Sequence, residues 1–226
     1  MNLDFFSNIV KIMAKYWKVF LLQGVGYTLL LSAITVVCGA VLGLLLYLGR
    51  TARFKPLNWL CIAIVEVVRG TPMLLQLYIA YFLVPKILPF HVTEFGSVTV
   101  GLVINSGCYV SEIFRSGIQA IDKGQTEAAR SLGLNGRQTM IRIILPQAIK
   151  NILPALGNEF ITMIKQASLA STFFVAELTT SFRTVQSITF MAIPAIMIAG
   201  TIYLALTFTL SRLVGVFERR LQVYER

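Results

Sequence analysis

Between Val19 and Gly49 the chain runs for 31 residues without a charged side chain. An α-helix rises about 1.5 Å per residue, so about 20 mainly apolar residues are enough to cross the hydrocarbon core of a bilayer. A cleavable signal peptide has an apolar region of only about 7–15 residues, which is shorter than this stretch. The feature therefore predicts a membrane-spanning helix that is kept in the mature protein.

The rest of the chain is equally apolar, with 56% hydrophobic and 13% charged residues, against roughly 25% charged residues in soluble domains. We expect an all-α membrane protein that forms a single transmembrane domain over residues 1–226. The second span should kink at Gly70-Thr71-Pro72, because proline removes a backbone hydrogen bond. Five spans are expected, at about residues 19–49, 57–85, 95–117, 149–174 and 190–212.

Basic residues indicate the orientation, because short cytoplasmic loops carry an excess of lysine and arginine. With the N-terminus outside and the C-terminus inside, the inner segments hold thirteen of them, including Arg226, and the outer segments hold five. The formal net charge of +10 does not indicate nucleic-acid binding, since these residues flank apolar runs.

Three of the five outer basic residues, Lys11, Lys15 and Lys18, precede the first span and oppose this orientation. Aromatic and aliphatic residues alternate with them in an amphipathic pattern. Such a helix lies in the interface plane of a membrane, so membrane lipid is an expected partner of this segment.

One connection is long and polar, at residues 118–146 between spans three and four. Asp122 resembles the start of a capping box with Gln125, and Gly133 suits the left-handed residue after a helix. Asn135 can cap a second short helix, which Pro146 should end. We expect two short helices that form a compact knob on the cytoplasmic side.

The knob carries a motif with fixed spacing: Glu127-Ala128-Ala129, Gly133 and Ile143-Ile144-Leu145-Pro146. It resembles the cytoplasmic signature of permease subunits of binding-protein-dependent ATP-binding cassette importers. Residues 65–72, 111–118 and 157–160 resemble the polar amino-acid branch of that family, and the resemblance extends from Gln23 to about Arg220.

The resemblance implies a subunit of the prokaryotic inner membrane that works with cytoplasmic ATPase subunits, an extracytoplasmic substrate-binding protein and a second permease copy, identical or different. In such importers the knob docks into a groove on the ATPase. The residues that this implies for ATPase coupling are Glu127, Ala128, Ala129, Leu132, Gly133 and Arg137.

Catalytic and metal chemistry are not expected. The chain has no G-x-x-x-x-G-K-[ST] sequence to hold ATP phosphates, and His91 is its only histidine. Cys38, Cys61 and Cys108 lie inside apolar runs, where we interpret them as small apolar residues. We expect neither a cofactor, a metal site nor an enzymatic activity in this chain.

Ionisable residues inside a span are costly and should face a partner or a wet cavity. In span four, Glu159, Met163 and Gln166 share one helix face, with Asn158 and Thr162 beside it. A carboxylate near mid-span can bind an ammonium or guanidinium group, either the α-ammonium of any amino acid or a cationic side chain. We favour basic amino acids such as arginine; the alternative is a carboxylate hydrogen-bonded within the bundle.

Other polar groups are interpreted as structural. Glu66 and Arg69 are three residues apart and can neutralise each other, and Glu112 can pair with Arg115. Asn105, Tyr109 and Glu112 form a polar stripe on span three. Gly39 and Gly43 form a G-x-x-x-G pair that allows close helix approach.

Two other functions remain open at this point. A self-sufficient secondary carrier or channel would need ion-coupling sites or a polar pore ring, and a membrane scaffold would need neither. The knob separates these alternatives from an ATP-driven amino-acid importer, because a carrier has no use for an ATPase-docking element.

Overall fold

The computed structural model describes residues 3–223, and all regular secondary structure in this range is helical. Arg226, one of the thirteen basic residues assigned to the inner side, lies outside the described residues. The helical segments follow in chain order as α1 (Leu3–Trp17), η1 (Lys18–Val25), α2 (Gly26–Arg50), α3 (Lys55–Arg69), α4 (Met73–Ile87), α5 (Glu94–Gln119), α6 (Lys123–Ser131), α7 (Gly136–Thr139), η2 (Met140–Ile144), α8 (Leu145–Gln166), η3 (Ala167–Phe173), α9 (Leu178–Thr189) and α10 (Ala192–Val223).

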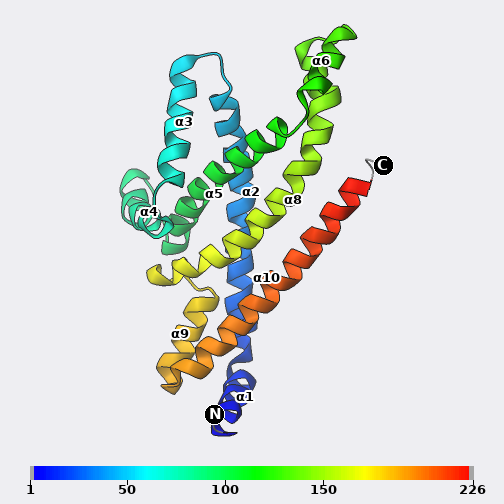
Figure 1. The fold of residues 1–226 in the computed structure, drawn as a ribbon. Helices are drawn as coiled ribbons and strands as arrows, with labels where there is room; N and C mark the ends of the chain where they lie inside the picture. The colour runs from blue at the N-terminus through cyan, green and yellow to red at the C-terminus, as the bar shows by residue number, and fades with distance from the viewer. Residues whose placement is uncertain (1–2, 224–226) are drawn as a thin grey trace.

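The elements sort to two ends of the molecule (Figure 1). The knob that contains α6, the α2–α3 connection and the C-terminal end of α10 lie at one end. The helix α1 and the turn between α9 and α10 lie at the other end. The helix α4, which carries the predicted outer residue Lys86, lies between these two ends, so the separation agrees with the predicted grouping of basic segments only in part.

Three helical stretches of the described residues are long and apolar enough to cross a membrane: Phe5–Arg50, Glu94–Gln119 and Ala192–Leu221. The pair α3 and α4 makes a fourth if it is one broken span. The predicted fourth span corresponds to α8 and η3, and α8 is too polar to belong to this group. The count of five and the orientation therefore stay predictions.

The break in the second predicted span lies where the sequence indicated, but it is far sharper than a kink. The axes of α3 and α4 differ by 112°, and Pro72 has extended backbone before α4 begins. Gln76 satisfies the freed carbonyls, because its Nε2 donates to the oxygens of Val68 at 2.6 Å and Thr71 at 3.0 Å. Asn105 of α5 donates to Gln76 Oε1 at 2.8 Å, which ties the break to α5.

The central contact of the bundle joins α2 to α5. A Cβ added at Gly39 would lie 2.9 Å from Ser106 Oγ, and one at Gly43 would lie 2.8 Å from the carbonyl oxygen of Gly107. The predicted close helix approach at Gly39 and Gly43 is confirmed. The helix that approaches α2 there is α5 of the same chain. All three cysteines are free, with Cys61 and Cys108 buried in the bundle and Cys38 exposed.

The knob forms as two short helices, and Asp122 caps the first of them, but without the reciprocal Gln125 contact of the predicted capping box. The Asp122 carboxylate accepts from the backbone N–H of Gly124 at 2.6 Å, and Gly133 has φ of +82°. Asn135 and Gln138 form a reciprocal capping box. The expected end at Pro146 is wrong: α7 continues through the π-helical η2 into α8, where Pro146 occupies the first turn, a position that tolerates a missing N–H.

Glu177 starts α9 and is completely buried. Its carboxylate accepts from the N–H groups of Thr179 and Thr180 at 2.7 and 2.6 Å, and from the Tyr203 hydroxyl at 2.8 Å. Burial raises the pKa of this carboxyl above its ordinary value, and the donors oppose that rise. The contact to Tyr203 joins α9 to α10.

Candidate functional site

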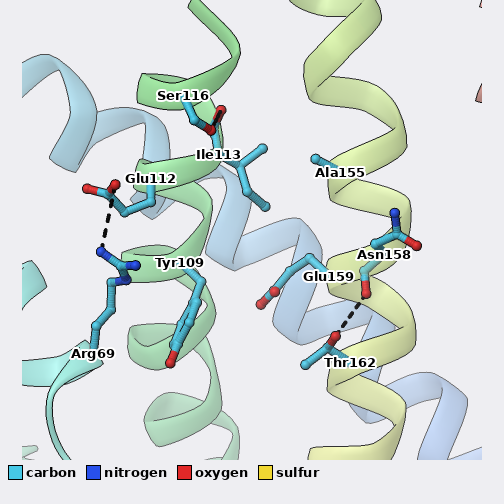
Figure 2. Close-up of a pocket in the computed structure, with 9 residues that line it drawn as sticks. All are labelled: Arg69, Tyr109, Glu112, Ile113, Ser116, Ala155, Asn158, Glu159 and Thr162. Atoms are coloured by element: carbon cyan, nitrogen blue, oxygen red, sulfur yellow. Dashed lines mark hydrogen bonds and ion pairs between the residues drawn. The ribbon is translucent and has the colours of Figure 1, made fainter. Parts of the chain in front are cut away.

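A cavity of about 470 Å³ lies between α5 and α8, beside the C-terminal end of α3 (Figure 2). Its volume falls in the range of about 300–1,000 Å³ that is typical of small-molecule sites. The lining is strongly polar and carries charges of both signs. The residues that line it are Arg69, Tyr109, Glu112, Ile113, Ser116, Ala155, Asn158, Glu159 and Thr162.

Glu159 extends from α8 toward α5 (Figure 2) and is only 7% exposed. Its Oε1 accepts a hydrogen bond from Ser106 Oγ at 2.9 Å, the hydroxyl against which Gly39 packs. Among the described residues no lysine or arginine forms a salt bridge with it. A buried carboxylate with a single neutral donor has strong unused capacity to bind a cation.

Glu112, by contrast, is surrounded by three arginines. Arg50 pairs with its Oε1, Arg115 donates to Oε2 from Nε at 2.9 Å and from a terminal nitrogen at 2.7 Å, and Arg69 lies 3.7 Å from Oε2. The predicted pairing with Arg115 is confirmed. The expected pair between Glu66 and Arg69 is wrong, because Arg69 contacts Glu112 of α5 instead.

Arg69 is the arginine with the most unused capacity at the cavity. Its contact with Glu112 is long, and that carboxylate is already bound by two other guanidinium groups. The guanidinium lies 5.5 Å from the centre of the Tyr109 ring, a distance suited to a cation–π contact. Arg69 lines the cavity, and Figure 2 shows its guanidinium directed at Glu112.

Of the five residues predicted to bind substrate, three line the cavity: Asn158, Glu159 and Thr162. The Thr162 hydroxyl donates a hydrogen bond to the carbonyl oxygen of Asn158, at 3.0 Å. Met163 is 1% exposed, and neither it nor Gln166 is part of the lining.

Two further acceptors are buried without a donor, Asn105 Oδ1 and Gln166 Oε1. Asn105 lies one turn from Tyr109 along α5, and Gln166 lies one turn from Thr162 along α8. Neither of them lines the cavity. A buried acceptor without a partner costs free energy. A ligand that donates a hydrogen bond to such an oxygen would remove that cost.

Sequence reasoning missed Arg69, Ser106 and Tyr109 as site residues. The polar stripe on span three contained Tyr109, but the stripe alone did not indicate which helix faces it. Arg69 was assigned to a local pair, since its spacing from Glu66 does not indicate that Glu112 of α5 lies within reach. No group of three or more histidine, cysteine, aspartate or glutamate residues within the described range could hold a metal ion.

The knob residues form a second functional region, at the end of the molecule where α6 lies in Figure 1. Ala129 is buried at 3%, whereas Leu132 is 84% exposed. Glu127, Ala128, Gly133 and Arg137 are also exposed. Ala129 thus packs the knob together, and Leu132 presents an apolar side chain outward.

Comparison with known proteins gives a consistent result. Residues 36–223 match the family described as binding-protein-dependent transport system inner membrane component. The arginine transport system permease protein ArtQ of Bacillus subtilis (strain 168) is 38% identical over 222 residues, which cover 98% of this chain and 99% of that protein. The L-cystine transport system permease protein TcyB of the same organism is 39% identical, over 92% of this chain and 89% of that protein.

A solved structure is similar over the whole fold. The crystal structure of an amino acid ABC transporter with histidines contains a chain with a TM-score of 0.89 and 41% identity, covering 97% of this chain and 100% of that chain.

Proposed function

We propose that this chain, which belongs to the family of binding-protein-dependent transport system inner membrane components, forms the path for a basic amino acid such as arginine. At the coarser level, it is a permease subunit of an amino-acid ABC importer of the inner membrane, and the ATPase is a separate subunit. A carrier or channel without an ATPase is therefore set aside.

The observation that carries the substrate proposal is the buried Glu159 carboxylate, which lines the cavity and accepts from a single neutral donor. A guanidinium group has five N–H donors in a fixed fork and accepts nothing. A cationic side chain suits this carboxylate, whereas a neutral amide would leave its charge unpaired.

The rest of the amino acid has a matching group across the cavity. Arg69 can bind the α-carboxylate, since arginine–carboxylate pairs are strong and often bidentate. Asn158 and Thr162 complete the polar wall on α8. In this proposal Gln166 binds the far end of a long side chain, and Met163 supports the Glu159 turn of α8 from the buried side.

Coupling to ATP hydrolysis is assigned to the knob. Its exposed Leu132 and the neighbouring residues Glu127, Ala128, Gly133 and Arg137 form the proposed docking surface for the cytoplasmic ATPase. Two permease copies and an extracytoplasmic substrate-binding protein complete the proposed transporter. The bundle exposes many large apolar side chains, on α2 and α10 among others, which lipid and the second permease copy would cover.

Uptake by the assembled transporter in proteoliposomes tests this proposal. We expect ATP-dependent uptake of labelled arginine that unlabelled lysine inhibits and unlabelled glutamine or cystine inhibits at least tenfold less well. Preferred uptake of glutamine or cystine would contradict the substrate, and arginine uptake without the ATPase subunit would contradict the coupling.

A further inference from the structure

A second polar cavity lies at the opposite end of the molecule from the knob, where α1 packs beside the ends of α9 and α10 (Figure 1). Its volume is about 340 Å³. The polar side chains on its wall are Asn8, Lys11, Lys15 and Thr189, and its apolar part includes Ile12 and Met191. The proposed transport path does not use this cavity.

The charged side chains that line this cavity are both positive. Lys11 and Lys15 stand one turn apart on α1 and are both exposed. No salt bridge to either lysine occurs among the described residues, and the ammonium group of Lys15 lies 5.3 Å from the centre of the Tyr16 ring. Lys18 adds a third cation beyond them, 5.8 Å from the centre of the Trp17 ring.

The surroundings of the cavity are those of a membrane interface. Trp17 is 42% exposed and Phe190, which ends α9 in a left-handed conformation, is 91% exposed. Tryptophan is enriched at the level of lipid headgroups. On the other flank of α1, a groove of about 420 Å³ is lined mainly by apolar side chains, among them Ile9, Met13 and Ile202.

The helix α1 thus separates a basic cavity from an apolar groove, with the buried Ile12 between them. In the structure α1 continues through η1 into α2 as one helical stretch, Phe5–Arg50, so the basic cavity and the apolar groove flank the end of a span that faces away from the knob. Lysines in such a position attract anionic lipid. It also accounts for the three lysines that oppose the basic-residue rule, since a bound anion would neutralise their charge.

We propose that the cavity between α1 and α9 binds the headgroup of an anionic phospholipid, with the phosphate held by Lys11 and Lys15. Asn8 provides a hydrogen-bonding group for the glycerol part of such a headgroup, whereas the Thr189 hydroxyl already donates to the carbonyl oxygen of Val185 at 2.8 Å. The occupant is a membrane lipid rather than a soluble phosphate, because the cavity is bordered by exposed apolar side chains that a small hydrophilic ion would leave in water.

Native mass spectrometry of the assembled transporter, released from nanodiscs of phosphatidylglycerol and phosphatidylcholine in equal amounts, tests the proposal. We expect about one phosphatidylglycerol retained per permease chain, in preference to phosphatidylcholine. The double variant Lys11→Gln/Lys15→Gln should lower this retention about 10- to 30-fold, whereas Lys11→Arg/Lys15→Arg should keep it. The matched control Lys55→Gln/Lys86→Gln, at two exposed lysines away from the cavity, should also keep it.

Equal retention of the two lipids, or unchanged retention in the Gln/Gln variant, would overturn the proposal. An equal loss in the control would do the same, because it would mean that the site depends on overall charge. Release of the lipid by millimolar glycerol phosphate would contradict the lipid assignment and point to a soluble anion. Basal ATPase activity should remain in every variant, since no residue changed here belongs to the transport path or the knob.

Discussion

A zwitterionic amino acid needs an anion and a cation at its binding site, and the cavity between α5 and α8 offers one of each. Glu159 is held by a single hydroxyl, and Arg69 is held by one long ionic contact and an aromatic ring. Glu112 is already satisfied by Arg50 and Arg115. The two unsatisfied residues are therefore the ones free to exchange their contacts for a substrate.

Arg69→Gln should weaken the apparent affinity for every transported amino acid, because the α-carboxylate is common to all of them. The loss of a charge-assisted hydrogen bond is worth about 1.5–3 kcal/mol, which corresponds to about 10- to 150-fold in affinity. Concentration dependence of uptake measures it, with Lys165→Gln, at an exposed lysine of α8, as the control. A loss confined to basic amino acids would show that Arg69 does not bind the carboxylate.

At the scale of the elements, the site depends on how closely α2 approaches α5. Gly39→Ala would place a methyl group 2.9 Å from Ser106 Oγ, the donor to Glu159. Overpacking of this kind costs about 1–3 kcal/mol, so we expect a lower melting temperature and weaker arginine uptake. The control Gly26→Ala meets no atom within 4 Å and should not lower either quantity. A Gly39→Ala protein with wild-type stability and uptake would contradict this role.

The left-handed turn at Gly133 sets the direction of the two knob helices. Valine is strongly disfavoured at φ of +82°, whereas asparagine tolerates it. We expect Gly133→Val to insert normally but to lower the amount of arginine transported per ATP at least tenfold, or to release the ATPase in a pull-down. Gly133→Asn should retain most of both activities. Wild-type coupling in the valine variant would refute the proposed role of the turn.

Local chemistry made much of the element structure predictable from sequence. Asn135 and Gly133 indicated their cap and turn, since these preferences act within a few residues. The 112° break was not predictable, because Pro72 indicates where a helix ends but not the direction in which the next one leaves. Arg69 was misassigned because its partner Glu112 is distant in sequence, whereas Glu159 was found because a carboxylate inside an apolar span is itself a signal.

The whole molecule has a knob at one end and α1 at the other, which suits an N-terminus outside and a knob inside. Labelling with a membrane-impermeant thiol reagent tests this orientation in a background without the three native cysteines. Arg183→Cys should react in intact cells, and Lys123→Cys should react only after permeabilisation. Reaction of Lys123→Cys from outside would reverse the orientation, and equal reaction at both sites would contradict the number of spans between them.

Glu159 connects this architecture to the substrate, so its variant tests the account most directly. Glu159→Gln keeps the shape of the side chain and removes its charge. In proteoliposomes with the assembled transporter, arginine and lysine should lose about 10- to 150-fold in apparent affinity, while assembly, melting temperature and basal ATPase activity stay at wild-type levels. Glu218→Gln, at an exposed residue of α10, is the control. Unchanged arginine kinetics in Glu159→Gln, or a loss of thermal stability that lowers uptake of every substrate equally, would contradict the account.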